Sequence, residues 1–152
     1  MSDPTSLPFV PAPTPEELLR GEVMRALRAD GVQPTIDEDG DVLLPVEDQV
    51  VFVRCVDSLP PLVRVFGCWQ VGDVPGGELV HLRAANAVTG AITLIKLTLA
   101  EDLLIVAAEL IVNEASPLGP LVRGAVDAVL GAARTWYATI GEILGEPLAD
   151  LA

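Results

Sequence analysis

Basic side chains are scarce in this chain, which has 9 Lys and Arg residues against 22 Asp and Glu residues and a formal net charge of −13. Lys96 is the only lysine, and no run of basic residues occurs anywhere in the sequence. Nucleic acids and anionic membranes both require clustered Lys and Arg on the protein that binds them. The composition therefore predicts a protein that binds neither nucleic acid nor a membrane surface.

The residues of common catalytic sites are also missing. His81 is the only histidine, and no Gly-x-Ser-x-Gly or comparable nucleophile motif accompanies it. The glycine-containing segment 72–77 lacks the Lys-Ser/Thr pair of a phosphate-binding loop. We expect a packing or surface role for His81, which lies within an apolar stretch of a predicted helix. We expect neither enzymatic activity nor a cofactor.

Cysteine is rare as well: the chain has Cys55 and Cys68, and their spacing does not match a metal-binding motif. Residues 1–13 have neither the basic start nor the apolar core of a signal peptide. No segment of the sequence has the length of a membrane span. The resulting expectation is a cytoplasmic protein. Because disulfides are rare in that compartment, both cysteines are expected to be buried thiols.

Acidic residues cluster in one short segment, Thr35-Ile-Asp-Glu-Asp-Gly-Asp-Val-Leu-Leu-Pro-Val46. When Gly40 is aligned with the glycine of a calcium loop, the position of the bidentate glutamate falls on Val46. Helices should also flank a calcium loop, whereas both flanks here favour strands. Asp39-Gly40 is instead typical of a hairpin turn. We therefore predict a turn between two strands and no metal site.

The length of 152 residues suits a single domain with one core. Residues 1–13 are predicted to be a disordered tail, because the prolines at positions 4, 8, 11 and 13 prevent regular hydrogen bonding. We expect one domain over residues 14–145 and a short C-terminal tail over residues 146–152. The domain begins with a helix, because Thr14 is placed to cap it and Glu17 to close a capping box. Asp30-Gly31 is expected to end that helix.

Strand signals, meaning β-branched or aromatic runs bounded by turn residues, follow the first helix. The predicted strands are 33–37, 41–46, 50–56, 62–71, 91–99 and 102–112, and the other predicted helices are 78–89 and about 116 or 120 to 144. The final helix has a regular apolar stripe, on which Trp136 is expected to pack against the sheet. Because the helices are too few for βαβ repeats, we predict an α+β domain with an antiparallel sheet of five to six strands.

The last predicted hairpin, 91–112, is apolar on both faces, although an antiparallel sheet with one wet face should alternate. One face of its second strand is wholly apolar, and it includes Leu104, Val106, Ala108 and Leu110. The first and third helices can cover one face of this hairpin, so something else must cover the other face or part of it. We take those four residues as the candidate apolar sheet face.

The helix predicted over residues 78–89 is apolar nearly all round, which indicates deep burial or an interface. If Leu79, Leu82 and Ala85 face the sheet, small apolar residues form an outward stripe with Arg83 near its edge. This candidate dimer or partner surface consists of Val80, Arg83, Ala84, Ala87 and Val88. The alternative is that Phe9 and Val10 of the N-terminal segment cover the stripe.

Several short motifs together resemble one bacterial family. They are Arg64-Val-Phe-Gly-Cys-Trp69, Leu82-Arg-Ala-Ala-Asn86, Leu94-Ile-Lys-Leu97 and Ala132-Ala-Arg-Thr-Trp136. The chain resembles the YbjN-type domain from about Thr14 to Leu144, and that domain is similar in fold to the peptide-binding chaperones of type III secretion. The N-terminal tail and one extra predicted strand depart from the family pattern.

The resemblance implies an α-β-β-β-α-β-β-α domain that is often dimeric and presents apolar grooves to extended polypeptide. The middle helix, 78–89 here, is commonly the dimer element of the secretion chaperones. The family has no catalytic residues to carry over, and some members are labelled sensory regulators.

Three functional classes remain open from the sequence. The first is a non-catalytic, chaperone-like module that binds an extended segment of another protein. The second is a homodimeric structural or regulatory protein of the sensory-regulator type, without a client groove. The third is an enzyme or small-ligand sensor. The first two differ in whether apolar surface remains open once a homodimer has formed.

Overall fold

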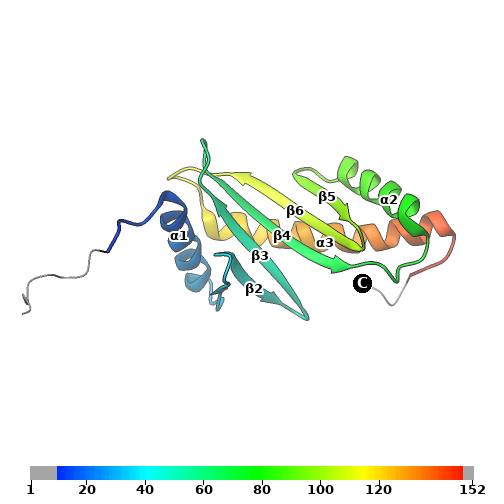
Figure 1. Ribbon diagram of the computed structural model, residues 1–152, viewed down its shortest axis with the longest axis horizontal. Coiled ribbons are helices and arrows are strands. Elements are labelled where there is room, and N and C mark those ends of the chain that lie inside the picture. The colour runs from blue at the N-terminus through cyan, green and yellow to red at the C-terminus, as the bar shows by residue number, and fades with distance from the viewer. Residues whose placement is uncertain (1–9, 149–152) are drawn as a thin grey trace, which may run out of the picture.

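The computed structural model describes residues 10–148, which form three helices and a six-stranded sheet (Figure 1). The helices are α1 (Pro15–Ala29), α2 (Gly77–Ala91) and α3 (Leu118–Leu144). The strands are β1 (Thr35–Ile36), β2 (Val42–Val46), β3 (Gln49–Val56), β4 (Leu62–Gln70), β5 (Ile95–Ala100) and β6 (Leu103–Ile111). No helix of this part of the chain combines the length and apolar character needed to cross a membrane.

The sheet has the order β1-β2-β3-β4-β6-β5, and every neighbouring pair of strands is antiparallel. Four of its connections are hairpins, two of them with loops of only two residues at 47–48 and 101–102, whereas α2 links β4 to β5. Because α2 carries the chain past the position beside β4, β5 forms the edge of the sheet, and β6 then occupies the position between β4 and β5. The predicted α+β class, the antiparallel sheet and its five to six strands are confirmed.

The start of α1 follows the predicted capping chemistry. Thr14 Oγ1 accepts a hydrogen bond from the Glu17 backbone N–H at 3.2 Å, and the Thr14 backbone N–H donates to Glu17 Oε2 at 2.7 Å. Both donors would otherwise lack partners within the helix. At the other end, Gly31 has φ +81°, a left-handed conformation that glycine adopts without steric cost.

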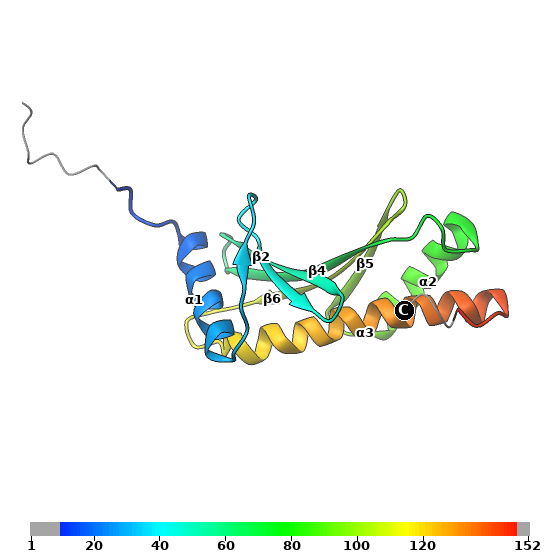
Figure 2. The same cartoon turned by 90° about the horizontal axis from the view of Figure 1, so that it is seen from below.

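All three helices lie on one side of the sheet (Figure 2). The longest, α3, runs along this inner face and contacts β4, β5 and β6, whereas α1 contacts α3 and β3 and α2 contacts α3 and β5. The core fills the space between these layers, with Leu27, Leu104, Trp136 and Ile140 among its largest fully buried side chains. No helix of residues 10–148 covers the opposite, outer face.

Several predicted boundaries are wrong by a few residues, and the largest error lies between α2 and β5. Residues 91–94 were expected to be strand, but α2 includes Ala91 and β5 begins only at Ile95. Ile92 is the C-cap, whose N–H donates to the Val88 carbonyl, and Leu94 has φ +65°. The chain therefore needs these residues to turn from the helix into the strand.

The first strand is also shorter than predicted, since only Thr35 and Ile36 pair with β2. Pro34 has no N–H to donate to a ladder, and Asp37 already belongs to the turn.

The two predicted tails are only partly described. Within residues 10–148, Val10 to Pro13 have no regular structure and are exposed, whereas Glu146 donates its N–H to the Gly141 carbonyl and Leu148 packs against the core. Residues 1–9 and 149–152 lie outside the described part, so the predicted disorder of residues 1–13 and the limits of the tails stay predictions.

Trp136 occupies the junction of α2, α3 and the sheet, as its place on the apolar stripe predicts. Its side chain is fully buried, and its indole Nε1 donates to the His81 backbone carbonyl at 3.1 Å. The rings of His81 and Tyr137 contact it edge to face, with centroids 5.2 and 5.0 Å away. These contacts join α2 to α3.

We therefore expect Trp136→Ala to lower the free energy of unfolding by about 3–5 kcal/mol, because it removes a buried aromatic side chain and leaves a cavity. Urea denaturation followed by circular dichroism measures this loss. Arg134→Ala is the matched control on the same helix, since Arg134 is exposed and its 3.5 Å ion pair with Glu47 contributes about 1 kcal/mol or less. Equal, small losses for the two variants would contradict the core assignment.

Candidate functional site

His81 has the packing role that its sequence context predicts. The ring is buried, and Nε2 lies 3.0 Å from the Val74 carbonyl and 3.3 Å from the Pro75 carbonyl, so it serves as the donor. This hydrogen bond ties the loop before α2 to the helix. The ring therefore closes the end of the core beside Trp136.

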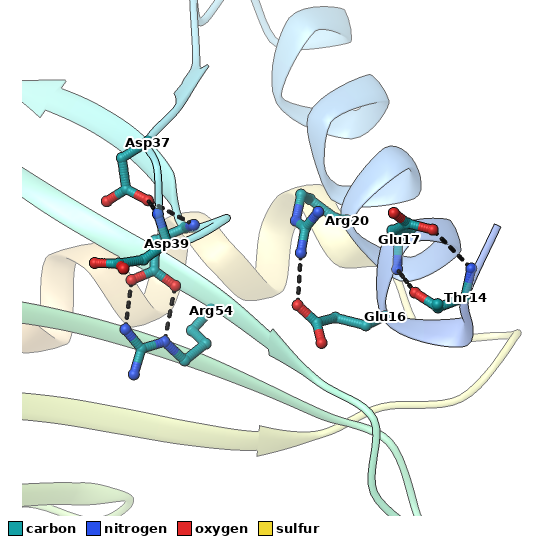
Figure 3. A network of polar contacts seen from close by, with 8 residues as sticks. Thr14, Glu16, Glu17, Arg20, Asp37, Asp39 and Arg54 are labelled. Atoms are coloured by element: carbon teal, nitrogen blue, oxygen red, sulfur yellow. Dashed lines mark hydrogen bonds and ion pairs between the residues drawn. The ribbon is translucent and has the colours of Figure 1, made fainter.

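The aspartate-rich segment forms the predicted hairpin turn between β1 and β2. The Gly40 N–H donates to the Asp37 carbonyl at 3.1 Å, and Gly40 has φ +81°. Asp37 Oδ1 accepts from the backbone N–H groups of Asp39 and Asp41, both at 2.9 Å. Figure 3 shows the contacts of the Asp37 carboxylate beside the capping box of α1. The turn interpretation is confirmed.

Asp41 at the end of this turn is buried and pairs with Arg54 of β3. Arg54 Nε and Nη2 donate to its two carboxylate oxygens at 2.8 and 2.6 Å. The hydrogen bond to Asp41 is the main cause that raises the pKa of Arg54. The turn acids thus bind backbone donors and an arginine, and residues 10–148 contain no cluster of three or more His, Cys, Asp or Glu that could hold a metal ion.

The candidate apolar sheet face is the inner face, which α3 covers. Leu104 and Val106 are fully buried, Ala108 is nearly so, and Leu110 is half-buried. These residues therefore belong mainly to the core. The prediction that they form an apolar face open to a partner is wrong. Successive side chains of a strand alternate between faces. Because both faces of this hairpin are apolar, the pattern did not indicate which one the helix would cover.

The outward stripe expected on α2 is also wrong in its orientation. Ala84 and Val88 are buried and Val80 is half-buried, so only Arg83 and Ala87 of the candidate surface are exposed. The exposed side carries the larger residues instead: Leu79 is 61% and Leu82 is 45% exposed. Small residues face inward because α2 packs closely against α3 and β5.

The outer face of the sheet carries apolar side chains that no helix of the described residues covers, beside the charged side chains of Arg54, Arg64, Lys96 and Glu109. The helix-free face, as we name it, consists of the outward residues Leu43, Val50, Phe52, Val56, Leu62, Phe66, Cys68, Ile105, Ala107 and Ile111, of which Ala107 is buried. Phe52 and Phe66 stack at its centre, with ring centroids 5.2 Å apart and planes at 18°. The guanidinium groups of Arg54 and Arg64 lie 5.4 and 5.2 Å from the Phe66 centroid. Sequence reasoning found the apolar strands but missed this face.

A groove lies at one end of the sheet, between α1 and the turn that joins β3 to β4. This α1 groove has a volume of about 450 Å³, and its apolar lining includes Leu18, Leu19, Val56, Leu59, Pro61 and Val112. Leu18 is 56% and Leu59 100% exposed, so two leucines stand open to solvent at its edge. The sequence gives little indication of this groove, because Leu18 lies beside the stripe of α1 that faces the core.

The α1 groove and the helix-free face are continuous through Val56. This residue lines the groove and pairs with Leu62 across β3 and β4. Leu62 in turn pairs with Ile111, which is 71% exposed. Apolar side chains thus extend from the groove as far as Ile111 on the outer face. The next row of outward residues is charged, since Arg54, Arg64 and Glu109 lie side by side across β3, β4 and β6, and it separates the groove from Phe52 and Phe66.

The two cysteines are both free, but only Cys55 is buried as predicted. Cys68 lies on the helix-free face and is exposed, because it shares the outward alternation of Phe66 along β4. Burial raises the pKa of the Cys55 thiol to about 11. Burial also raises the pKa of Cys68.

One family model matches this chain in sequence, and two solved structures match it in fold. The family model described as T3SS (YopN, CesT) and YbjN peptide-binding chaperone 1, TY-Chap1, matches residues 17–145. The crystal structure of YbjN from E. coli, described as a putative transcription regulator, is 15% identical in sequence to this chain, and the two superpose with a TM-score of 0.61. The match covers 80% of this chain and 92% of the YbjN chain. A chain of the HopA1–SchA chaperone–effector complex is 16% identical in sequence to this chain and superposes with a TM-score of 0.58. That match covers 82% of this chain and 98% of the chain from the complex. No curated protein matches the sequence.

We expect the two thiols to differ strongly in reactivity in the folded protein. At about pH 8, Cys68 should react with a maleimide while Cys55 stays unmodified, because Cys55 is buried and its pKa of about 11 leaves it almost entirely protonated. Denaturation without reductant should make both react. Mass spectrometry of tryptic peptides measures this, and Cys68→Ser is the control that should abolish native labelling. Rapid native labelling of Cys55 would contradict its burial.

Proposed function

Because the chain belongs to the TY-Chap1 family of T3SS and YbjN peptide-binding chaperones, we propose that it binds an extended, apolar segment of another polypeptide and catalyses no reaction. One observation supports this above all: in the described residues, the α1 groove and the adjoining outer residues Val56, Leu62 and Ile111 form an apolar surface that no other element covers. In a single domain of this size, contiguous exposed apolar surface marks an interaction site.

The α1 groove is the proposed anchor of the bound segment. Leu18 and Leu59 are largely exposed, and covering each would contribute on the order of 1–2 kcal/mol through removal of apolar surface from water. The bound chain then continues over Val56 to Leu62 and Ile111, and it reaches the stacked pair Phe52 and Phe66 beyond the charged row of Arg54, Arg64 and Glu109. An extended segment fits this path better than a compact ligand, since the path follows the end of the sheet and then its face.

Charge sets the character of the client. The rim of the α1 groove carries Glu22, Asp57 and Glu114, and the whole chain has a net charge of −13. Such a field repels acidic segments and favours encounter with neutral or basic ones. The proposed client segment is therefore apolar and neutral or basic.

We expect Leu18→Glu to weaken binding of short apolar peptides by about tenfold or more, because it removes apolar contact and places a carboxylate in the groove. Fluorescence anisotropy with a panel of labelled synthetic peptides, apolar and polar, measures the affinities. The variant should remain folded, since Leu18 is more than half exposed.

Ile143→Glu is the matched control, because Ile143 is 42% exposed on α3 and lines no part of the α1 groove. It should bind the same peptides as the unmodified chain. Equal binding by both variants, or no binding of any peptide by the unmodified chain, would contradict the proposed site.

Homodimerisation through α2 is a second proposal, favoured by the exposed side of that helix. Leu79 and Leu82 lie three residues apart, and Arg83 and Ala87 continue the same exposed side. A two-fold pairing would bury both leucines on each copy. The surface differs from the α1 groove in its elements, so a dimer of this kind leaves the groove and the helix-free face open for a client.

Leu79→Glu should convert the dimer into a monomer, because it places a charge twice at a two-fold interface. Sedimentation equilibrium of the unmodified and variant chains measures the association state. Leu18→Glu is the control that should leave the dimer intact. A monomer for the unmodified chain at ordinary working concentrations would remove the basis for this dimer.

A further inference from the structure

The α1 groove has a candidate occupant within the same chain. We propose that the segment Leu7 to Val10, in the N-terminal stretch that precedes α1, docks in the α1 groove and competes there with a client. This inference rests on the proposed function of that groove, because it assigns the regulation of the same site.

The groove begins at the point where this stretch joins the helix. Pro15, the first residue of α1, lines the groove together with Leu18, Leu19 and Glu22. These positions form one side of the helix, so the groove extends along α1 from its N-terminal end. A chain that reverses direction just before Pro15 would lie along it.

The length of the stretch matches the length of the groove wall. From Pro15 to Glu22, α1 rises about 10 Å at roughly 1.5 Å per residue. An extended, proline-rich chain advances about 3.1 Å per residue, so roughly four residues span this distance. Leu7 to Val10 supply that number, and Pro11 to Thr14 remain for the change of direction.

The composition of the stretch suits an apolar groove. A polyproline II helix has three residues per turn, so residues three apart share one side. Pro4, Leu7, Val10 and Pro13 have this spacing and would form one apolar ridge, with Phe9 beside it. Prolines at positions 8, 11 and 13 carry no N–H. Fewer backbone donors therefore lose their water when the stretch lies on apolar side chains.

Charge is compatible as well. Glu22, Asp57 and Glu114 at the rim disfavour an acidic occupant. Residues 1–13 contain one acid, Asp3, and no basic residue, in a chain that has 22 acids in total. Leu7 to Val10 bear no charge, so their docking meets no repulsion from the rim.

Of this stretch, the structure describes residues 10–14, which lead away from α1, and Val10 is 80% exposed (Figure 1). Docking therefore requires the chain to reverse direction between Val10 and Pro15. A short tether gives an effective concentration on the order of millimolar, so an intrinsic Kd of about 0.1 mM would weaken a client's apparent affinity about tenfold.

Photo-cross-linking of the full chain tests the docking without any client. With Phe9→p-benzoylphenylalanine, irradiation should link position 9 within one chain to residues of the groove, in peptides covering 15–22, 56–61 or 112–114. Tandem mass spectrometry identifies the sites. Leu18→Glu in the same chain should reduce the yield several-fold. The control is p-benzoylphenylalanine in place of Ile143, which should give no link to these peptides.

Links to α2 or to the helix-free face would overturn the proposal, as would a product with twice the chain mass or no link at all. A competition measurement adds a second readout. The double variant Leu7→Ser and Phe9→Ser should bind the apolar peptide panel about tenfold more tightly than the unmodified chain, and unchanged affinity would contradict competition.

The two proposals fail in different ways. If groove links form but no peptide binds to either chain, the docking stands and the proposed client function is wrong. If peptides bind in a manner that depends on Leu18 while the links lie elsewhere, the client function stands and the docking is wrong.

Discussion

The packing of α3 along one face of the sheet is the interaction on which the rest of this structure depends. Its apolar stripe, which includes the fully buried Trp136, packs against β4 and β6. The Trp136 indole also binds the His81 carbonyl, which fastens α2 to the same side. Because α1 contacts α3 as well, all three helices share one face of the sheet.

The function that we propose is a consequence of this one-sided arrangement. A sheet covered on one side keeps its other side open, and here that side carries the stacked Phe52 and Phe66 with two arginine side chains beside them. At one end, α1 and the turn between β3 and β4 do not close on each other, which leaves the α1 groove. The net charge of −13 counteracts aggregation of a chain with so much open apolar surface.

Local features of the fold could be predicted from the sequence because each depends on residues close together in the chain. Thr14 and Glu17 form the capping box through contacts three residues apart, and Asp39-Gly40 form the turn because glycine tolerates a positive φ. The stripe that includes Trp136 indicated a long, half-buried helix. The order of helices and strands followed from the same local signals.

The sequence by itself thus determined the elements, their order and the family, whereas the tertiary structure decided which sides of those elements are open. Leu104 and Ile105 are apolar neighbours on β6. Because α3 covers the inner face, Leu104 is buried in the core, whereas Ile105 lies on the outer face. On α2, Ala84 is buried and Leu79 exposed, because the close approach of α3 and β5 admits a methyl group more readily than a leucine side chain. The α1 groove joins residues from distant parts of the chain, and no local pattern encodes such a meeting. Burial is a property of the packed layers, so only their assembly could reveal the surface left for a partner.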